Sequence, residues 1–198
     1  MRLTNDGFEE AIRKRQSEVA VQGNEWEQFV TKFLREHLPP EYGVFFKPQP
    51  GSKVGRLFTI SYPTNLWNEV DLTEIGDNAF IFGDVDIGIV KGDRAIVVVS
   101  CKLSLHNRLT ETLFYSLLYH QKGIRVVLAT PDKGQSGRSE WGTPDRPTKN
   151  RLLARRFLSG VYIDYETGLF PMPRVRAGFG DIVRPLKELP KDIQRWFP

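Results

Sequence analysis

Two short apolar runs separated by a tight turn constrain the fold of this chain more than any other feature. The first run is Asp84–Val90, the second is Arg94–Lys102, and Lys91, Gly92 and Asp93 lie between them. Both runs are rich in valine and isoleucine, which favour strands, and a glycine in a three-residue connection favours a hairpin. The sequence therefore predicts two adjacent antiparallel strands in the middle of a sheet.

The second run ends in a lysine that its own pattern does not explain. Side chains alternate along a strand, so Val97 and Val99 are expected on one face. The opposite face then carries Ile96, Val98, Ser100 and Lys102. Because Ile96 and Val98 are expected in the core, the ammonium group of Lys102 is expected at the end of a buried face of the sheet. It loses hydration there unless an anion meets it.

The neighbouring strand offers two acids for this role. Asp84 and Asp86 lie on the same face of that strand, and Asp86 is favoured because it directly precedes the apolar run. An acid and a lysine at adjacent strand ends can hold a divalent metal ion and orient a water molecule. A simple ion pair between strand ends is the alternative reading.

These residues resemble the active-site motif of the PD-(D/E)xK nuclease superfamily. In that family an Asp opens one strand and a (D/E)-x-Lys tripeptide closes the next; here Asp86 lies 14 residues before Ser100, and Lys102 is two further on. Val85 replaces the usual proline, and Ser100 replaces the acid. Some type II restriction enzymes of the family carry Ser-x-Lys and take the acid from the following helix, 13 or 14 residues after the lysine. Those positions are Tyr115 and Ser116 here.

The resemblance implies a Mg²⁺ site and roles for its residues. Asp86 and the carbonyl oxygen of Cys101 would bind the metal, with Asp84 as a second ligand or as the motif acid itself. Lys102 would orient or deprotonate the attacking water, or neutralise charge at the scissile phosphate. Two further acids are candidates by position. They are Glu27, on a helix before the sheet, and Glu111, an acid on the following helix that would replace the missing motif acid, unless it pairs with Arg108.

A polar cluster after the lysine predicts contacts to bases. Arg108 follows Lys102 by six residues, as a base-reading arginine does in the subgroup that this motif resembles, and Ser104, His106 and Asn107 precede it. Arginine pairs with guanine O6 and N7, and asparagine with adenine N6 and N7. A helix cap with a surface cluster is the alternative interpretation.

A basic irregular loop over about 131–148 predicts contacts to the DNA backbone. It and the helix after it carry an excess of positive charge, in which Lys133, Arg138 and Lys149 are the candidate phosphate contacts and Arg151 is a further basic residue. Trp141 is expected to be exposed in this loop. A solvated charged loop is the alternative.

Length and composition limit the class of protein to which this chain can belong. A length of 198 residues with 40% apolar and 26% charged residues favours one domain spanning 1–198. The net charge of +4 permits a polyanionic partner. One cysteine, Cys101, excludes an intrachain disulfide and is expected to be buried. Met1–Val21 is unlike a signal peptide, and no apolar run reaches the roughly 20 residues of a membrane span, so a cytoplasmic protein is expected.

The remaining pattern predicts an α/β fold with a central mixed sheet flanked by helices, as in restriction endonucleases. Gly23 and Asn24 are expected to separate two N-terminal helices, and Ser104 to cap a long helix with Leu105, Leu109, Leu113 and Leu117 on one stripe. The expected helices are 6–21, 25–37, 104–122, 149–158 and 186–197; the expected strands outside the hairpin are 44–47, 57–61, 79–82, 124–129 and 160–165.

The predicted function is a Mg²⁺-dependent type II restriction endonuclease. As the resemblance implies, it would act as a homodimer on a short specific sequence of duplex DNA and leave 5′-phosphates. Two alternatives remain open: a catalytically silent DNA-binding or assembly module of the same fold, and a resolvase or repair nuclease that reads DNA structure. Motifs of serine hydrolases, P-loop nucleotide hydrolases and zinc sites are absent from the sequence.

Overall fold

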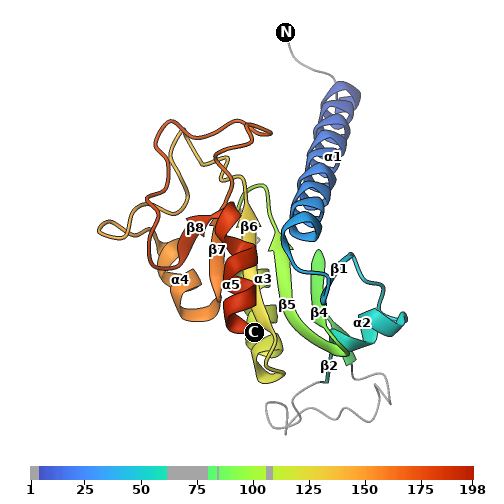
Figure 1. Cartoon of the computed structure of the whole chain (residues 1–198). Helices are drawn as coiled ribbons and strands as arrows, with labels where there is room; N and C mark the ends of the chain where they lie inside the picture. Colours follow the sequence, from blue (N-terminus) through green and yellow to red (C-terminus); the bar gives the residue numbers. More distant parts are fainter. Residues whose placement is uncertain (1–4, 62–79, 84, 106–108) are drawn as a thin grey trace, which may run out of the picture.

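The predicted hairpin lies inside a six-stranded sheet of order β1-β4-β5-β6-β7-β8. The structure is a computed structural model that describes residues 5–61, 80–83, 85–105 and 109–198. Strands β1, β4 and β5 are antiparallel, and β5 to β8 are parallel (Figure 1). Their bounds are Tyr42–Phe46 (β1), Ile87–Lys91 (β4), Arg94–Cys101 (β5), Arg125–Thr130 (β6), Gly160–Ile163 (β7) and Val183–Pro185 (β8).

Helices cover both faces of this sheet, which confirms the predicted α/β fold with a mixed central sheet. One face packs against α1 (Asn5–His37) and α5 (Leu189–Trp196), and the other against α3 (Leu109–Gln121) and α4 (Lys149–Phe157). A short helix α2 (Lys53–Leu57), a strand pair β2 (Thr59–Ser61) and β3 (Phe80–Phe82), and a 3-10 turn at Leu186–Glu188 complete the described elements. None of the described helices is long and apolar enough to cross a membrane.

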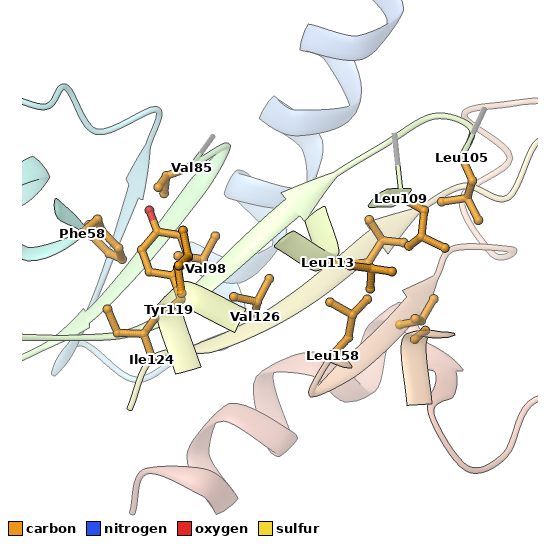
Figure 2. Close-up of a cluster of buried hydrophobic side chains, with 14 of the residues drawn as sticks. Phe58, Val85, Val98, Leu105, Leu109, Leu113, Tyr119, Ile124, Val126 and Leu158 are labelled. Carbon is orange, nitrogen blue, oxygen red and sulfur yellow. The ribbon is translucent and has the colours of Figure 1, made fainter. Parts of the chain in front are cut away.

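Each face of the sheet has its own apolar core. Trp26, Val30 and Leu34 of α1 are fully buried beside Val97 and Val99 of β5, as their helical spacing indicates. The Trp26 indole Nε1 also donates a hydrogen bond of 3.1 Å to the Ala129 carbonyl of β6, which fixes α1 to the sheet. On the other face, the α3 side chains pack on strand residues such as Val98 and Val126 (Figure 2).

The strand alternation predicted around Ile96 is wrong in one detail. Ile89 pairs with Val97 and Val90 pairs with Ala95, so Ile96 is an extra residue without a partner in the register. This irregularity is a β-bulge, which lets two successive side chains face the same side. Ile96 therefore packs with Val97 beside α1, and not with Val98 beside α3.

The expected break at Gly23 and Asn24 is also wrong, because α1 runs through both residues as one helix of 33 residues. Glycine inside a helix costs up to about 1 kcal/mol relative to alanine, yet does not by itself end one. Burial of Trp26 and Val30 stabilises the following turns of α1 and outweighs this local cost.

Replacing Gly23 with alanine is expected to stabilise the fold by roughly 0.4–1 kcal/mol. The added Cβ would meet no atom within 4 Å, and alanine restricts the unfolded chain more than glycine does. Chemical denaturation would measure the change. Gly55→Ala is the matched control: its Cβ would lie 1.8 Å from the Gln49 carbonyl oxygen, so this variant should be less stable than the wild type. A destabilised Gly23→Ala variant would contradict the expectation.

The helix after the hairpin differs from its prediction in two respects. Its described range is Leu109–Gln121, and Ser104 and Leu105 are not helical, so this serine does not cap it. The predicted stripe is buried at Leu105, Leu109 and Leu113, but Leu117 is 51% exposed and Leu118 is buried instead. Residues four apart turn by about 40° around a helix, so a stripe of this spacing drifts off the buried face within a few turns.

The C-terminal part confirms β6 and α4 and adds one element. Val183–Pro185, which directly precedes the expected last helix, forms the edge strand β8 beside β7. Trp141, expected to be exposed in the loop before α4, is fully buried in the core beside α3 and α4. Cys101 is buried, as its place in a strand predicted.

Candidate active site

Asp86 and Lys102 meet where the hairpin strands reach the same edge of the sheet. Lys102 Nζ lies 3.2 Å from Asp86 Oδ2, and the backbone amide of Cys101 donates to the same oxygen at 2.7 Å. Asp86 is 4% exposed and Lys102 is 6% exposed. The pairing of β4 with β5 brings these residues together, because Ile87 lies opposite Val99 in the register. The buried lysine therefore has the anionic partner that its position requires.

This pair forms one wall of a cleft of about 800 Å³. Helix α1 forms another wall through Val19, Gly23 and Glu27, and the chain after β1 forms a third. Glu27 reaches across to Lys47, whose Nζ lies 2.5 Å from Glu27 Oε2. Lys47 is fixed in turn by its own amide, which donates to the Asp86 carbonyl at 2.9 Å. Glu27 and Asp86 thus face one cleft from two different elements.

Cys101 is surrounded by these charges. Burial raises the pKa of its thiol well above the usual value, and the carboxylates of Asp86 and Glu27 raise it further. The ammonium groups of Lys102 and Lys47 oppose this shift. The raised pKa favours the neutral thiol over the thiolate.

Ser100 and Glu111 lie away from this cleft. The Ser100 hydroxyl is buried against Thr112 of α3, with 3.2 Å between the two oxygens. Glu111 is exposed near the start of α3, and these three residues line a separate cavity of about 10 Å³. Tyr115, 13 residues after Lys102, lines both the cavity and the cleft. In the related motif, this position of the helix supplies the second acid. Here it places a tyrosine at the cleft.

The residues predicted to contact DNA fall into three groups. Ser104 lines the cleft, while His106, Asn107 and Arg108 lie outside the described residues, as does Asp84, the predicted metal ligand. Lys133 is partly buried: it donates to Gln22 of α1 at 2.7 Å and lies over the Phe170 ring, and burial lowers its pKa. Arg138 and Lys149 are exposed.

Two residues of the cleft were not singled out from the sequence. Lys47 follows a strand whose neighbour carries Asp86, but that pairing depends on the register of β1 with β4, which the sequence does not give. In the sequence, Tyr115 stands out only because the related motif has an acid at this position. Its place at the cleft follows from the packing of α3 on the sheet.

The oxygen atoms at this cleft fit a small divalent cation. Glu27 Oε2 is shielded from solvent, lies against the Lys47 ammonium group, and lines the same cleft as Asp86. No group of three His, Cys, Asp or Glu side chains suited to a metal occurs among the residues that the structure describes. Mg²⁺ accepts such a sparse shell, because it binds one or two carboxylates and keeps water or phosphate oxygens in its other positions.

Comparison with known proteins shows the family of this chain. A family model described as BsaWI restriction endonuclease type 2 matches residues 67–171, which is more than half of the chain and includes Asp86 and Lys102. The chain belongs to the BsaWI restriction endonuclease family. No curated protein matches it.

Two solved structures share the fold of this BsaWI-family chain. The specific restriction endonuclease AgeI–DNA complex has a TM-score of 0.59 at 17% identity, over 92% of this chain and 69% of that one. The pre-specific BsaWI–DNA complex has a TM-score of 0.51 at 13% identity, over 98% of this chain and 69% of that one. The predicted restriction-endonuclease-like fold is therefore confirmed.

Proposed function

We propose that the protein is a Mg²⁺-dependent type II restriction endonuclease. It would hydrolyse phosphodiester bonds of duplex DNA at a short specific sequence and leave 5′-phosphates. The observation that carries the proposal is the buried Asp86–Lys102 pair on one wall of a cleft, with Glu27 on another. Membership of the BsaWI family and the similarity to two enzymes solved with DNA support it.

The proposed chemistry uses few groups. Asp86, the carbonyl oxygen of Cys101 and Glu27 would hold Mg²⁺, with Asp84 as a further ligand, and the bound ion would supply charge stabilisation and a more acidic water. Water oxygen attacks phosphorus, the bond to the 3′ oxygen breaks, and that oxygen leaves as a hydroxyl. Lys102, held by Asp86, hydrogen-bonds the water or the scissile phosphate as negative charge grows on it.

Base recognition and assembly complete the proposal. Ser104 at the cleft and the segment that continues through His106, Asn107 and Arg108 would meet the base edges. A homodimer would place two such clefts on the two strands of a palindromic site, because one small site cuts one strand.

A silent DNA-binding module is the second candidate. Ser100 faces α3 instead of supplying a motif acid, and Tyr115 occupies the helix position at the cleft. Both observations reduce the number of carboxylates near Lys102.

Cleavage of a long mixed-sequence duplex DNA in Mg²⁺ and in EDTA separates the candidates. Discrete fragments in Mg²⁺ alone are expected. A smear would identify a nuclease that reads DNA structure or no sequence. Intact DNA that the protein still retards in a gel would identify the silent module.

Glu27→Gln is expected to raise the Mg²⁺ concentration for half-maximal cleavage by about 10- to 100-fold. The amide keeps the shape of the side chain but removes the negative charge that faces the cleft beside Asp86. Glu25→Gln is the matched control, because Glu25 is exposed on the same helix. Equal Mg²⁺ requirements for Glu27→Gln and the control would exclude Glu27 from the metal site.

A further inference from the structure

Two long loops leave the sheet at the edge that carries Lys102. Strands β5, β6 and β7 are parallel, so their carboxyl ends lie at one edge. Residues 131–148 follow β6, and residues 164–182 follow β7. Figure 1 shows both segments extending from this end of the molecule. We refer to these two segments together as the double loop.

The double loop is held together by its own hydrogen bonds. The Ser139 amide donates to the Val175 carbonyl at 2.8 Å, and the Val175 amide donates to the Gly137 carbonyl at 3.1 Å. At its base, the Tyr165 hydroxyl donates to the Asp132 carboxylate and accepts from the Ala177 amide at 2.9 Å. The two segments therefore form one ordered unit.

Arg151 of α4 bonds to both segments of the double loop and holds them together. Its side chain is fully buried, it pairs with Asp181 at 2.8 Å, and it donates to the carbonyls of Gly142, Gly178 and Gly180 at 2.8–3.1 Å. The sequence grouped Arg151 with basic residues suited to DNA contact. That grouping is wrong for Arg151, because every direction of its guanidinium fork is used inside the protein.

Three other arginines of the double loop are placed differently. Arg138, Arg174 and Arg176 are exposed, and within the described parts of the chain no acid forms an ion pair with them. Arg138 lies opposite Val175 in a backbone bridge, which places the backbone of Arg138 beside the segment that carries Arg174 and Arg176. Arg176 also rests on the Tyr165 ring at 5.2 Å. An ordered unit thus carries three exposed arginines on two adjacent backbone segments.

We infer that Arg138, Arg174 and Arg176 form a phosphate-binding site of the double loop for the DNA backbone beside the cleaved bond. The inference rests on the proposed function. The double loop starts at the sheet edge that carries the cleft, and arginines on an ordered backbone lose less entropy on binding than arginines on a free loop. Contacts to phosphates position a duplex without reading its sequence. The site is therefore distinct from the cleft, in which the proposed function places the scissile phosphate.

The salt dependence of DNA binding tests this site. Anisotropy of a labelled duplex would be measured in EDTA for the wild type and for the triple variant Arg138→Gln, Arg174→Gln, Arg176→Gln. The matched control changes the same charge at the opposite edge of the sheet: Arg94→Gln, Arg125→Gln, Arg156→Gln, all exposed in the wild type. Each lost phosphate contact lowers the slope of log affinity against log salt by about 0.9.

The double-loop variant is expected to lose about 2–3 units of this slope, and the control is expected to keep it. The inference is overturned if the wild type binds and both triple variants retain its slope, or if both lose it equally. Wild-type protein that binds no duplex DNA would overturn the proposed function itself. Unfolding midpoints of all three proteins establish that each is folded.

Discussion

Replacing Lys102 with methionine is expected to lower the rate of DNA cleavage by about 10²- to 10³-fold, while DNA affinity changes little. The ammonium group is buried at the cleft wall, and Asp86 holds it at 3.2 Å. Methionine has a similar length and keeps the packing of the aliphatic stem. The variant therefore removes the charge and the hydrogen-bond donors that act on the water or the scissile phosphate.

Single-turnover cleavage and EDTA binding, measured on the same DNA, separate these two effects. Lys53→Met is the matched control, because Lys53 is exposed at the start of α2 and lies outside the cleft lining. Loss of binding in parallel with loss of cleavage would indicate a DNA-anchoring role for Lys102. An unchanged cleavage rate would contradict its role in the reaction.

Replacing Arg151 with methionine is expected to destabilise the protein by about 3–5 kcal/mol, because removing one partner leaves a buried network unpaired. The fully buried guanidinium satisfies three glycine carbonyls and pairs with Asp181. Methionine fills part of the volume but satisfies none of these oxygens.

Arg155→Met provides the control within the same ion-pair cluster. Arg155 also contacts Asp181, at 3.4 Å, but its side chain is 49% exposed, so its loss is expected to cost at most about 1 kcal/mol. Urea denaturation would measure both variants. Equal losses of stability for Arg151 and Arg155 would contradict the anchoring role of Arg151.

The alternating apolar pattern and the glycine turn of residues 84–102 were sufficient to predict the central hairpin and the lysine, Lys102, at the end of its second strand. This works because period-two burial and a glycine turn are local signals. The bulge at Ile96 has no such signal, since it arises from the register of two strands. The continuity of α1 at Gly23 also escaped prediction, because burial of Trp26 stabilises the helix from outside the local sequence.

The residues of the candidate site also fall into those that local sequence signals predict and those that only tertiary packing places. Asp86 and Lys102 could be predicted because one hairpin contains both. Glu27 was placed by family resemblance, and Lys47 was not singled out, since α1 and β1 reach the cleft only through tertiary packing. Trp141 and Arg151 look like exposed loop and helix residues in the sequence. The partners of Arg151 lie in the segment 164–182, far along the chain, and Trp141 shares its core cluster with Ala177 of that segment.

The most direct measurement is the sequence of every DNA end that the wild-type protein produces from a long mixed-sequence duplex in Mg²⁺. The proposed function predicts one short sequence at all ends, a 5′-phosphate on each, and the same ends at a much lower rate with Lys102→Met. Intact DNA under these conditions, bound equally by the wild type and by Lys102→Met, would contradict it.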